Sequence, residues 1–521
     1  MTWARVAAVE ELKTKGRMLV KPNGRQIALF DHRGEIFACD NACPHEGYPL
    51  SVGTLDGDCQ LTCNWHNWKF RLDTGRTLSG GDDVRIYPVR LEDGGIWLDM
   101  TEPPMEEVVH RALTGLKQAF RYAEEDRMAR ELGRIEAAGG DPLEALRAAV
   151  GWTYEHLEFG TGHAYAAAAD WLTLRKRDAG DEAEHLVPLV ETLLHMAWDV
   201  RAVPRFAYGD EIAAFDEAAF LAAVEAQDEL AAVAQVRGAL RDGLNETDLE
   251  PAFAKAALAH YQGFGHAAIY TVKTWELSAM LGAEARLPLL LALTRYLTET
   301  SREDLIPEFR SYAPSLAASQ NGTDAAPPAE AFVSGSVEQI LARIAETRAA
   351  PQALYRSLLQ AAALQMLRFD LSRQDRSDGP VSKNVGWLDF THAVTFANAG
   401  RRLAERVPGL WPAVLLQIGC FLGRNSGYLG NAPGAEDWAV EDPAAFLAEA
   451  RRGLFDHEAT EPIVAAHLVK VLTAVTEEVE IDPAAAYVPD LAAAANRFLH
   501  TPLRRKHALR TAKQALALIG R

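Results

Sequence analysis

Two pairs of cysteine and histidine near the start of the chain have the residue types and spacing to bind a metal cluster. Cys43 and His45 form a C-x-H pair, and Cys63 and His66 form a C-x-x-H pair further along. Two thiolates and two imidazoles are the ligands of a [2Fe–2S] centre in which two Cys bind one iron and two His bind the other. Imidazole ligands raise the reduction potential of such a cluster. These residues therefore predict a one-electron carrier that serves a second site.

A structural zinc site is the alternative, because two Cys and two His also form a common tetrahedral zinc site. Zinc fingers usually place two Cys together and two His together, whereas each pair here contains one of each type. The arrangement favours the iron–sulfur cluster, and zinc stays the competing hypothesis.

The residues around these pairs resemble the Rieske ferredoxin and Rieske oxygenase family over residues 1–101. The matching segments are Cys43-Pro-His-Glu-Gly-Tyr-Pro-Leu, Gly53, Cys63-Asn-Trp-His-Asn-Trp-Lys-Phe, Asp73-Thr-Gly75 and Tyr87-Pro-Val. Asn67 replaces the Gly that is usual in the family, and we expect a locally altered loop there. No hydroxyl side chain stands at positions 64, 65, 68 or 70. Because fewer donors to the cluster sulfurs lower the potential, an oxygenase-type carrier is predicted.

The size and charge of the chain limit its class. A chain of 521 residues is expected to form two or three domains. Its formal charge of −19 opposes binding to nucleic acid or to an anionic membrane. The first residues lack the pattern of a signal peptide, and no run of about 20 apolar residues is present. We expect a soluble, cytoplasmic protein without a membrane anchor.

Hydrophobic patterning changes sharply near residue 105. Runs such as 26–30, 35–38 and 96–99 resemble short strands separated by Gly and Asp turns. From residue 105 onward Ala, Leu and Glu recur at helical spacing. We predict a multidomain protein: a small all-β Rieske domain at 1–101, then a large all-α domain at 105–521 built from repeated helix pairs. Segments 311–336 and 373–384 are expected to be loops or linkers.

Histidines recur in phase along the helical part. Both His163 and His266 lie in a Gly-x-Gly-His-Ala segment, and an apolar helix follows each about twenty residues later. His392 and His467 begin two further units with the same layout. If the four helix pairs pack around one axis, the four imidazoles converge. Isolated buried histidines at helix starts are the competing interpretation for each unit taken singly.

The helical part resembles the questin oxidase-like proteins, with local agreement at His-Ala-Val-Thr from His392 and His-x-x-Lys from His467. Members of that family oxidise anthraquinone-type aromatic polyketides by ring opening or oxygen insertion. The resemblance implies a mononuclear non-haem Fe(II) with O2 as cosubstrate. The ligands it implies are four histidines and a carboxylated lysine, here His163, His266, His392, His467 and Lys470.

The position of Lys470 suits this unusual role. Lys470 lies three residues after His467, so both side chains project from one helix face among apolar neighbours. A buried lysine has a lowered pKa, and the neutral amine is the form that adds CO2 to give a carbamate. Projection into solvent or pairing with Glu477 is the alternative.

No catalytic residue is assigned from the sequence. His156, His260, Asp170 and Lys273 are candidates to support the iron ligands or to act as acids or bases, with surface salt bridges as the alternative for the last two. We expect a Rieske mono- or dioxygenase that oxidises or cleaves an aromatic small molecule. A separate NAD(P)H-dependent reductase or a ferredoxin would donate electrons, and homo-oligomer formation stays open. An electron-transfer or redox-sensing protein with a metal-free helical domain, and a metal hydrolase with a regulatory cluster, are the alternatives.

Overall fold

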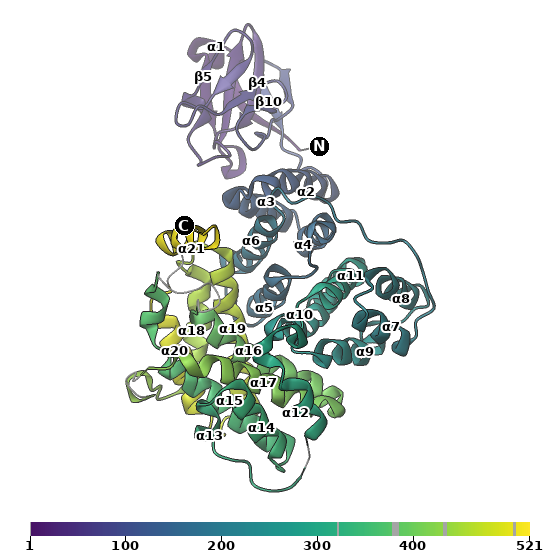
Figure 1. The fold of residues 1–521 in the computed structure, drawn as a ribbon. Helices are drawn as coiled ribbons and strands as arrows, with labels where there is room; N and C mark the ends of the chain where they lie inside the picture. The colour runs from purple at the N-terminus through teal and green to yellow at the C-terminus, as the bar shows by residue number, and fades with distance from the viewer. Residues whose placement is uncertain (1, 320–321, 378–384, 431–434, 504–506, 521) are drawn as a thin grey trace. The chain divides into compact units, whose positions relative to one another are not determined.

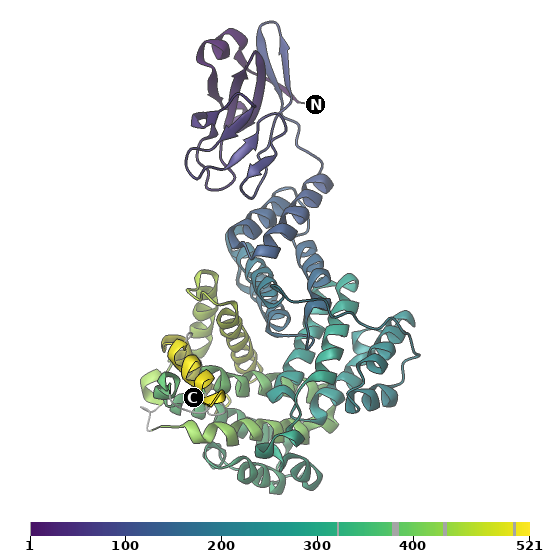
Figure 2. The same cartoon turned by 45° about the horizontal axis from the view of Figure 1, so that its top comes forward.

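The computed structural model describes residues 2–319, 322–377, 385–430, 435–503 and 507–520 (Figure 1). The chain divides into two compact units, 1–142 and 143–521. Strands occupy the start of the first unit, and helices joined by loops make up the second (Figure 2). The predicted fold class, a small β domain followed by a large helical region, is confirmed.

Ten short strands of the first unit form three antiparallel sheets, ordered β1-β10-β9, β2-β3-β4 and β5-β6-β7-β8. A single helix, α1 (Val9–Lys15), lies between the first two strands. The strands are β1 (Trp3–Ala8), β2 (Arg17–Val20), β3 (Ile27–His32), β4 (Glu35–Asp40), β5 (Thr54–Leu55), β6 (Gln60–Thr62), β7 (Lys69–Arg71), β8 (Thr77–Ser79), β9 (Val89–Glu92) and β10 (Gly95–Asp99).

Tight turns join neighbouring strands where the sequence predicts them. Arg33 and Gly34 connect β3 to β4 with φ of 56° and 84°, and Asp93 and Gly94 connect β9 to β10 with φ of 48° and 67°. Positive φ at both central residues matches the right-handed twist of a hairpin. The strands therefore pair in a fixed register.

Two helices complete the first unit. They are α2 (Met105–Tyr122) and α3 (Glu125–Ala137). The buried carboxylate of Asp82, between β8 and β9, lies 2.9 Å from Arg127 and 2.7 Å from Arg130 of α3. A buried charge needs such partners to offset its lost hydration. The compact unit that ends at Pro142 therefore includes α2 and α3 together with the predicted domain 1–101.

The second unit contains the predicted helix pairs. Its helices are α4 (Leu143–Thr153), α5 (His163–Asp178), α6 (Glu182–Asp199), α7 (Glu217–Glu225), α8 (Glu229–Arg241), α9 (Glu246–Ala259), α10 (His266–Leu281), α11 (Ala283–Glu299), α12 (Tyr312–Ala318), α13 (Glu330–Val333), α14 (Val337–Glu346), α15 (Pro351–Arg368), α16 (Trp387–Arg406), α17 (Trp411–Asn425), α18 (Pro443–Arg452), α19 (Pro462–Ile481), α20 (Val488–His500) and α21 (Ala508–Leu518). The four pairs are α5/α6, α10/α11, α16/α17 and α19/α20, and the two helices of each pair pack together.

The first helices of the four pairs form a closed ring in the second unit (Figure 1). Helix α5 packs on α10, α10 on α16, α16 on α19, and α19 on α5. Gly265 allows the close approach at the start of α10. Its φ is 83°, and a Cβ there would lie 2.7 Å from the Phe421 ring and 2.9 Å from Phe396. Only glycine meets both requirements.

The two expected linkers differ in outcome. Among its described residues, segment 311–336 contains the short helices α12 and α13. Residues 378–384 of the second expected linker lie outside the described residues. No helix among the described residues has both the length and the apolar character required to span a membrane.

Candidate metal centres

The four predicted cluster ligands come together on two loops of the first unit, one between β4 and β5 and the other between β6 and β7. Cys43 and Cys63 are buried in the same small core, and their side chains are hydrogen-bonded to each other. The rings of His45 and His66 lie 4.7 Å apart between centroids. Burial raises the pKa of Cys43 to about 11. A bound cation would be needed to stabilise its thiolate.

Matching backbone hydrogen bonds shape the two ligand loops. The N–H of Cys43 donates to the carbonyl of residue 48 at 2.9 Å, and the N–H of Cys63 donates to that of residue 68 at 2.8 Å. The N–H of Gly47 and that of Asn67 donate to the carbonyls of Cys43 and Cys63. Gly47 has φ of 73° and Asn67 φ of 62°. Asn67 thus adopts the left-handed conformation that Gly47 adopts in the other loop, which Asn tolerates.

The loops have the donor set that an iron–sulfur cluster needs. The Nδ1 atom of His45 is buried and has no hydrogen-bond partner. An unpaired buried nitrogen is costly unless it binds something. The ring of His45 also stacks on Trp68 at 4.7 Å with an interplanar angle of 14°. The residues present thus fit a cluster held by Cys43, His45, Cys63 and His66.

The four predicted histidines of the second unit converge inside the helix ring. His392 Nε2 lies 3.1 Å from His266 Nε2 and 3.1 Å from His467 Nε2. The Nε2 atoms of His163 and His266 are 3.3 Å apart. His163 and His266 occupy the first positions of α5 and α10, whereas His392 and His467 are the sixth residues of α16 and α19. Each of the four helices supplies one imidazole.

Hydrogen bonds at Nδ1 direct the Nε2 lone pairs of three histidines toward the centre. A backbone carbonyl can only accept, so each Nδ1 carries the proton and Nε2 has a free lone pair. Burial lowers the pKa of His266 to about 4 and that of His467 to about 3, so both rings are neutral. The bonded pairs are His266 with Gly263, His392 with Leu388 and His467 with Ile463.

Lys470 is buried close to these histidines. Its Nζ atom is buried and has no hydrogen-bond partner. Burial lowers its pKa to about 8, and its charge contributes to the lowered pKa values of all four histidines. Glu477, the alternative partner, instead accepts a hydrogen bond from Asn398 at 2.9 Å. Free imidazole nitrogens and an unpaired amine form a donor set that fits a divalent metal ion.

Asp170 and Lys273 form a buried ion pair. The alternative given for them from the sequence is a salt bridge at the surface. Lys273 Nζ lies 2.8 Å from Asp170 Oδ1 and 2.8 Å from Glu276 Oε2. Burial raises the pKa of Asp170 to about 6. Burial would lower the pKa of Lys273, but the carboxylates of Asp170 and Glu276 outweigh it and raise that pKa. The pair links α5 to α10 beside the histidines and is not a surface bridge.

His156 and His260 have partners outside the histidine group. His156 Nδ1 lies 3.0 Å from the carbonyl of Val203. His260 lies between two carboxylates, with Nδ1 2.9 Å from Glu303 and Nε2 2.9 Å from Glu225. His156 ends a 3-10 turn before α5, and His260 directly follows α9. They stabilise local structure in the second unit.

Sequence reasoning missed Tyr270 and Asp199, which lie beside the histidines. The Tyr270 hydroxyl is 3.0 Å from His163 Nδ1. Asp199 accepts a hydrogen bond from the backbone N–H of Ala164, and burial raises its pKa to about 6. Tyr270 falls one helical turn after His266, and this spacing is the signal that could have identified it. Asp199 ends a neighbouring helix and gives no such signal.

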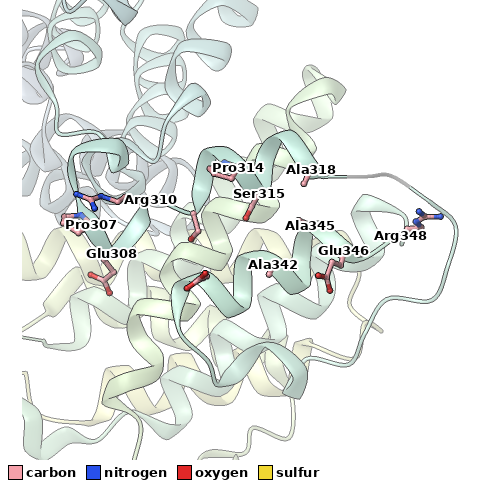
Figure 3. A pocket seen from close by; sticks show the side chains of 12 residues that line it. Pro307, Glu308, Arg310, Pro314, Ser315, Ala318, Ala342, Ala345, Glu346 and Arg348 are labelled. Atoms are coloured by element: carbon pink, nitrogen blue, oxygen red, sulfur yellow. The ribbon is translucent and has the colours of Figure 1, made fainter.

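A separate pocket of about 850 Å³ lies between α12 and α14 and the turn before them (Figure 3). Charged side chains, including Glu308, Arg310 and Glu346, line it together with small residues such as Ala342 and Ser315. None of the predicted site residues lines this pocket, so it is distinct from the histidine group.

The fold of the first unit and its paired Cys and His residues fit an iron–sulfur domain with mixed ligands. The model of the Rieske [2Fe-2S] domain matches residues 2–87. A ferredoxin component of the naphthalene 1,2-dioxygenase/salicylate 5-hydroxylase systems of Ralstonia sp is 34% identical over 100 residues, 19% of this chain and 95% of that protein. The chain belongs to the Rieske [2Fe-2S] family, which implies a [2Fe–2S] cluster.

Two further relatives extend this comparison. The 3-phenylpropionate/cinnamic acid dioxygenase ferredoxin subunit of Photorhabdus laumondii is 36% identical over 99 residues, 19% of this chain and 93% of that protein. The 4beta-methylsterol monooxygenase of Methylococcus capsulatus is 35% identical over 117 residues. That match covers 20% of this chain and 31% of the monooxygenase, so the chain spans about a third of its length. All three matches cover about a fifth of this chain.

Glu46 is expected to lower the reduction potential of the cluster. Its carboxylate oxygens lie 4.0 Å from His45 Nε2 and 3.6 Å from His66 Nδ1. A nearby negative charge favours the oxidised cluster, so Glu46→Gln should raise the potential by about 20 to 40 mV, the equivalent of roughly 0.5 to 1 kcal/mol. A redox titration followed by paramagnetic resonance measures the shift. Glu35→Gln, on β4, is the control, and an unchanged potential in Glu46→Gln would contradict the expectation.

His260 is expected to stabilise the second unit most at low pH. Burial would lower the pKa of His260, but hydrogen bonds to Glu303 and Glu225 outweigh it and raise that pKa. The stabilisation is full below the unfolded pKa of about 6.5 and is lost as pH rises through the folded value. The difference in melting temperature between wild type and His260→Gln should be larger at pH 6 than at pH 9. His110→Gln serves as an exposed control, and a pH-independent difference would refute this assignment.

Proposed function

We propose that this protein is a Rieske-containing non-haem iron oxygenase. The cluster, held by Cys43, His45, Cys63 and His66, delivers electrons to a mononuclear iron in the helix ring. The enzyme uses O2 to oxidise or cleave an aromatic small molecule of the anthraquinone or polyketide type. The convergence of four neutral imidazoles in the second unit is the observation that carries this proposal.

The donor set favours iron over magnesium or calcium. Imidazole nitrogen suits iron, zinc and copper, whereas magnesium and calcium prefer oxygen ligands. The proposed ligands are His163, His266, His392, His467 and Lys470. When bound, the iron supplies the redox chemistry that activates O2. The substrate class rests on the resemblance to questin oxidase-like proteins.

Residues of the ring support this chemistry in three ways. Carbonyls at Nδ1 hold the imidazoles in the tautomer that frees Nε2. Buried Val464 and Val471, each about one turn from His467, exclude water from the face of α19 that carries His467. Lys470, with its lowered pKa, is partly neutral near pH 8 and can react with CO2 to give an anionic carbamate ligand. The carbamate would offset part of the charge of Fe(II).

Electrons are proposed to come from a separate protein. Relatives of the first unit are ferredoxin components of dioxygenase systems. The glycines before His266 follow helix α9 and not a strand, so they do not form a dinucleotide-binding motif. We infer that an NAD(P)H-dependent reductase or a ferredoxin reduces the cluster.

An electron-transfer or redox-sensing protein is the second candidate. The chain covers 95% of the Ralstonia ferredoxin component, a protein of the electron-carrying type by its name. In this case the helical unit would bind a partner and hold no metal. The iron content separates the two candidates.

Metal analysis of His392→Ala tests the oxygenase proposal. Wild type should contain about three irons per chain, two in the cluster and one in the ring. His392→Ala should contain about two, with an unchanged cluster spectrum, because His392 contacts two of the other histidines. His156→Ala is the control and should keep all three. Two irons in the wild type would exclude the oxygenase and favour the electron carrier.

Replacement of Lys470 tests the carbamate. Lys470→Met keeps the length and burial of the side chain but removes the amine. Its iron affinity should fall by more than the 10- to 100-fold that is usual for loss of a supporting residue, because a direct ligand is lost. Iron uptake by wild type should also be lower without CO2 and recover with bicarbonate. Lys176→Met, exposed on α5, is the control, and full iron in Lys470→Met would disprove the carbamate.

A further inference from the structure

One histidine of the ring is held differently from the other three. His266, His392 and His467 each bond a backbone carbonyl from the chain just before them. His163 Nδ1 instead lies 3.0 Å from the hydroxyl of Tyr270, a side chain of the neighbouring helix α10. The orientation of His163 therefore depends on a contact between two helices.

The backbone before each histidine explains this difference. A 3-10 turn, Gln262–Gly265, precedes His266 and directs the Gly263 carbonyl toward Nδ1. His163 is the first residue of α5, and the preceding Gly162 is extended, with φ of −141° and ψ of −166°. An extended residue at this point carries no carbonyl back to the ring. A side chain must supply the partner for Nδ1.

Tyr270 is the polar residue that reaches His163. It lies one turn after His266, and its ring centroid is 5.3 Å from His266 and 5.8 Å from His163. Tyr270 is buried, and burial raises the pKa of its phenol well above the ordinary value. The hydroxyl thus stays protonated. The equivalent residues one turn after the other three histidines are Ala167, Phe396 and Val471, which have no hydroxyl.

A hydroxyl differs from a carbonyl because it can either donate or accept a proton in a hydrogen bond. When Tyr270 donates to Nδ1, the proton of His163 sits on Nε2 and points toward the lone pair of His266 Nε2 at 3.3 Å. When Tyr270 accepts from Nδ1, the Nε2 lone pair of His163 is free. The neutral imidazole of His163 carries one nitrogen-bound proton in both tautomers.

We propose that Tyr270 positions His163 as a metal ligand by accepting a hydrogen bond from its Nδ1–H in the metal-bound protein. The proposal rests on the proposed iron site and adds a residue that controls it. Without metal, the same hydroxyl stabilises the other tautomer, in which His163 donates to His266. With Tyr270 as its partner, His163 can adopt one tautomer in the metal-free protein and the other in the metal-bound protein. The three histidines that bond backbone carbonyls keep one tautomer.

Fe(II) affinity of the full chain tests this role. Anaerobic titration with Fe(II) against a chromophoric chelator gives the dissociation constant. Tyr270→Phe should weaken binding by about 10- to 100-fold, the usual effect of removing a partner of a ligating histidine. Tyr296→Phe is the matched control: its ring packs 4.8 Å from Tyr270, and its hydroxyl bonds Thr300 and no histidine. Its affinity should stay within about twofold of wild type.

Thermal unfolding separates positioning from packing. Loss of packing would lower the melting temperature of the metal-free protein in both variants. Loss of positioning would reduce the additional rise in melting temperature on Fe(II) binding in Tyr270→Phe alone. Equal Fe(II) affinity in the two variants would overturn the role of Tyr270. A wild-type chain that binds no Fe(II) beyond its cluster, or that binds it no better than His392→Ala, would overturn the iron site itself.

Discussion

Nitrogen lone pairs that face one another at 3.1 Å repel unless a positive charge lies among them, and the helix ring brings three such atoms together. His392 Nε2 has this spacing to both His266 and His467. Burial is the main cause of the lowered pKa of these rings, so water screens the repulsion less than it would at the surface. Each ring helix is backed by its partner helix, which limits how far the imidazoles can separate. The helix bundle thus holds these nitrogen atoms so close together that a shared proton or a bound cation is needed to offset their repulsion.

The two candidate centres fix their imidazoles by different means. In the first unit, backbone hydrogen bonds shape two loops, and His45 and His66 keep 30% and 41% of their side chains exposed. In the second unit, helices bury His467 and Lys470 and partly bury His163, His266 and His392. Exposed ligands suit the exchange of electrons with another protein, whereas a dry site suits chemistry that water would divert. The environment of each centre matches its proposed part in one reaction.

Much of this arrangement could be predicted from the sequence, because periodicity is a local property. Ligand spacing located the cluster loops, and the phase of the four histidines predicted four helix pairs. The supporting contacts could not be predicted: Tyr270 and His163 are far apart in sequence and meet only because α5 packs on α10. Repetition also misled, because His156 and His260 precede equivalent histidines but bond to Val203 and Glu303. Whether the Asp170–Lys273 pair is buried or exposed also could not be predicted, because it depends on which helices cover the pair.

Asp82 determines how small a fragment of this chain can keep the first unit intact. Its carboxylate is buried against Arg127 and Arg130, which belong to α3 and not to the sheets. A fragment ending with the last strand would leave this carboxylate without its arginines. The loop that carries Asp82 also places Gly80 and Gly81 against Trp68, the residue stacked on His45. The ion pairs of Asp82 therefore tie α3 to the strands. A fragment that keeps the first unit intact must include α3.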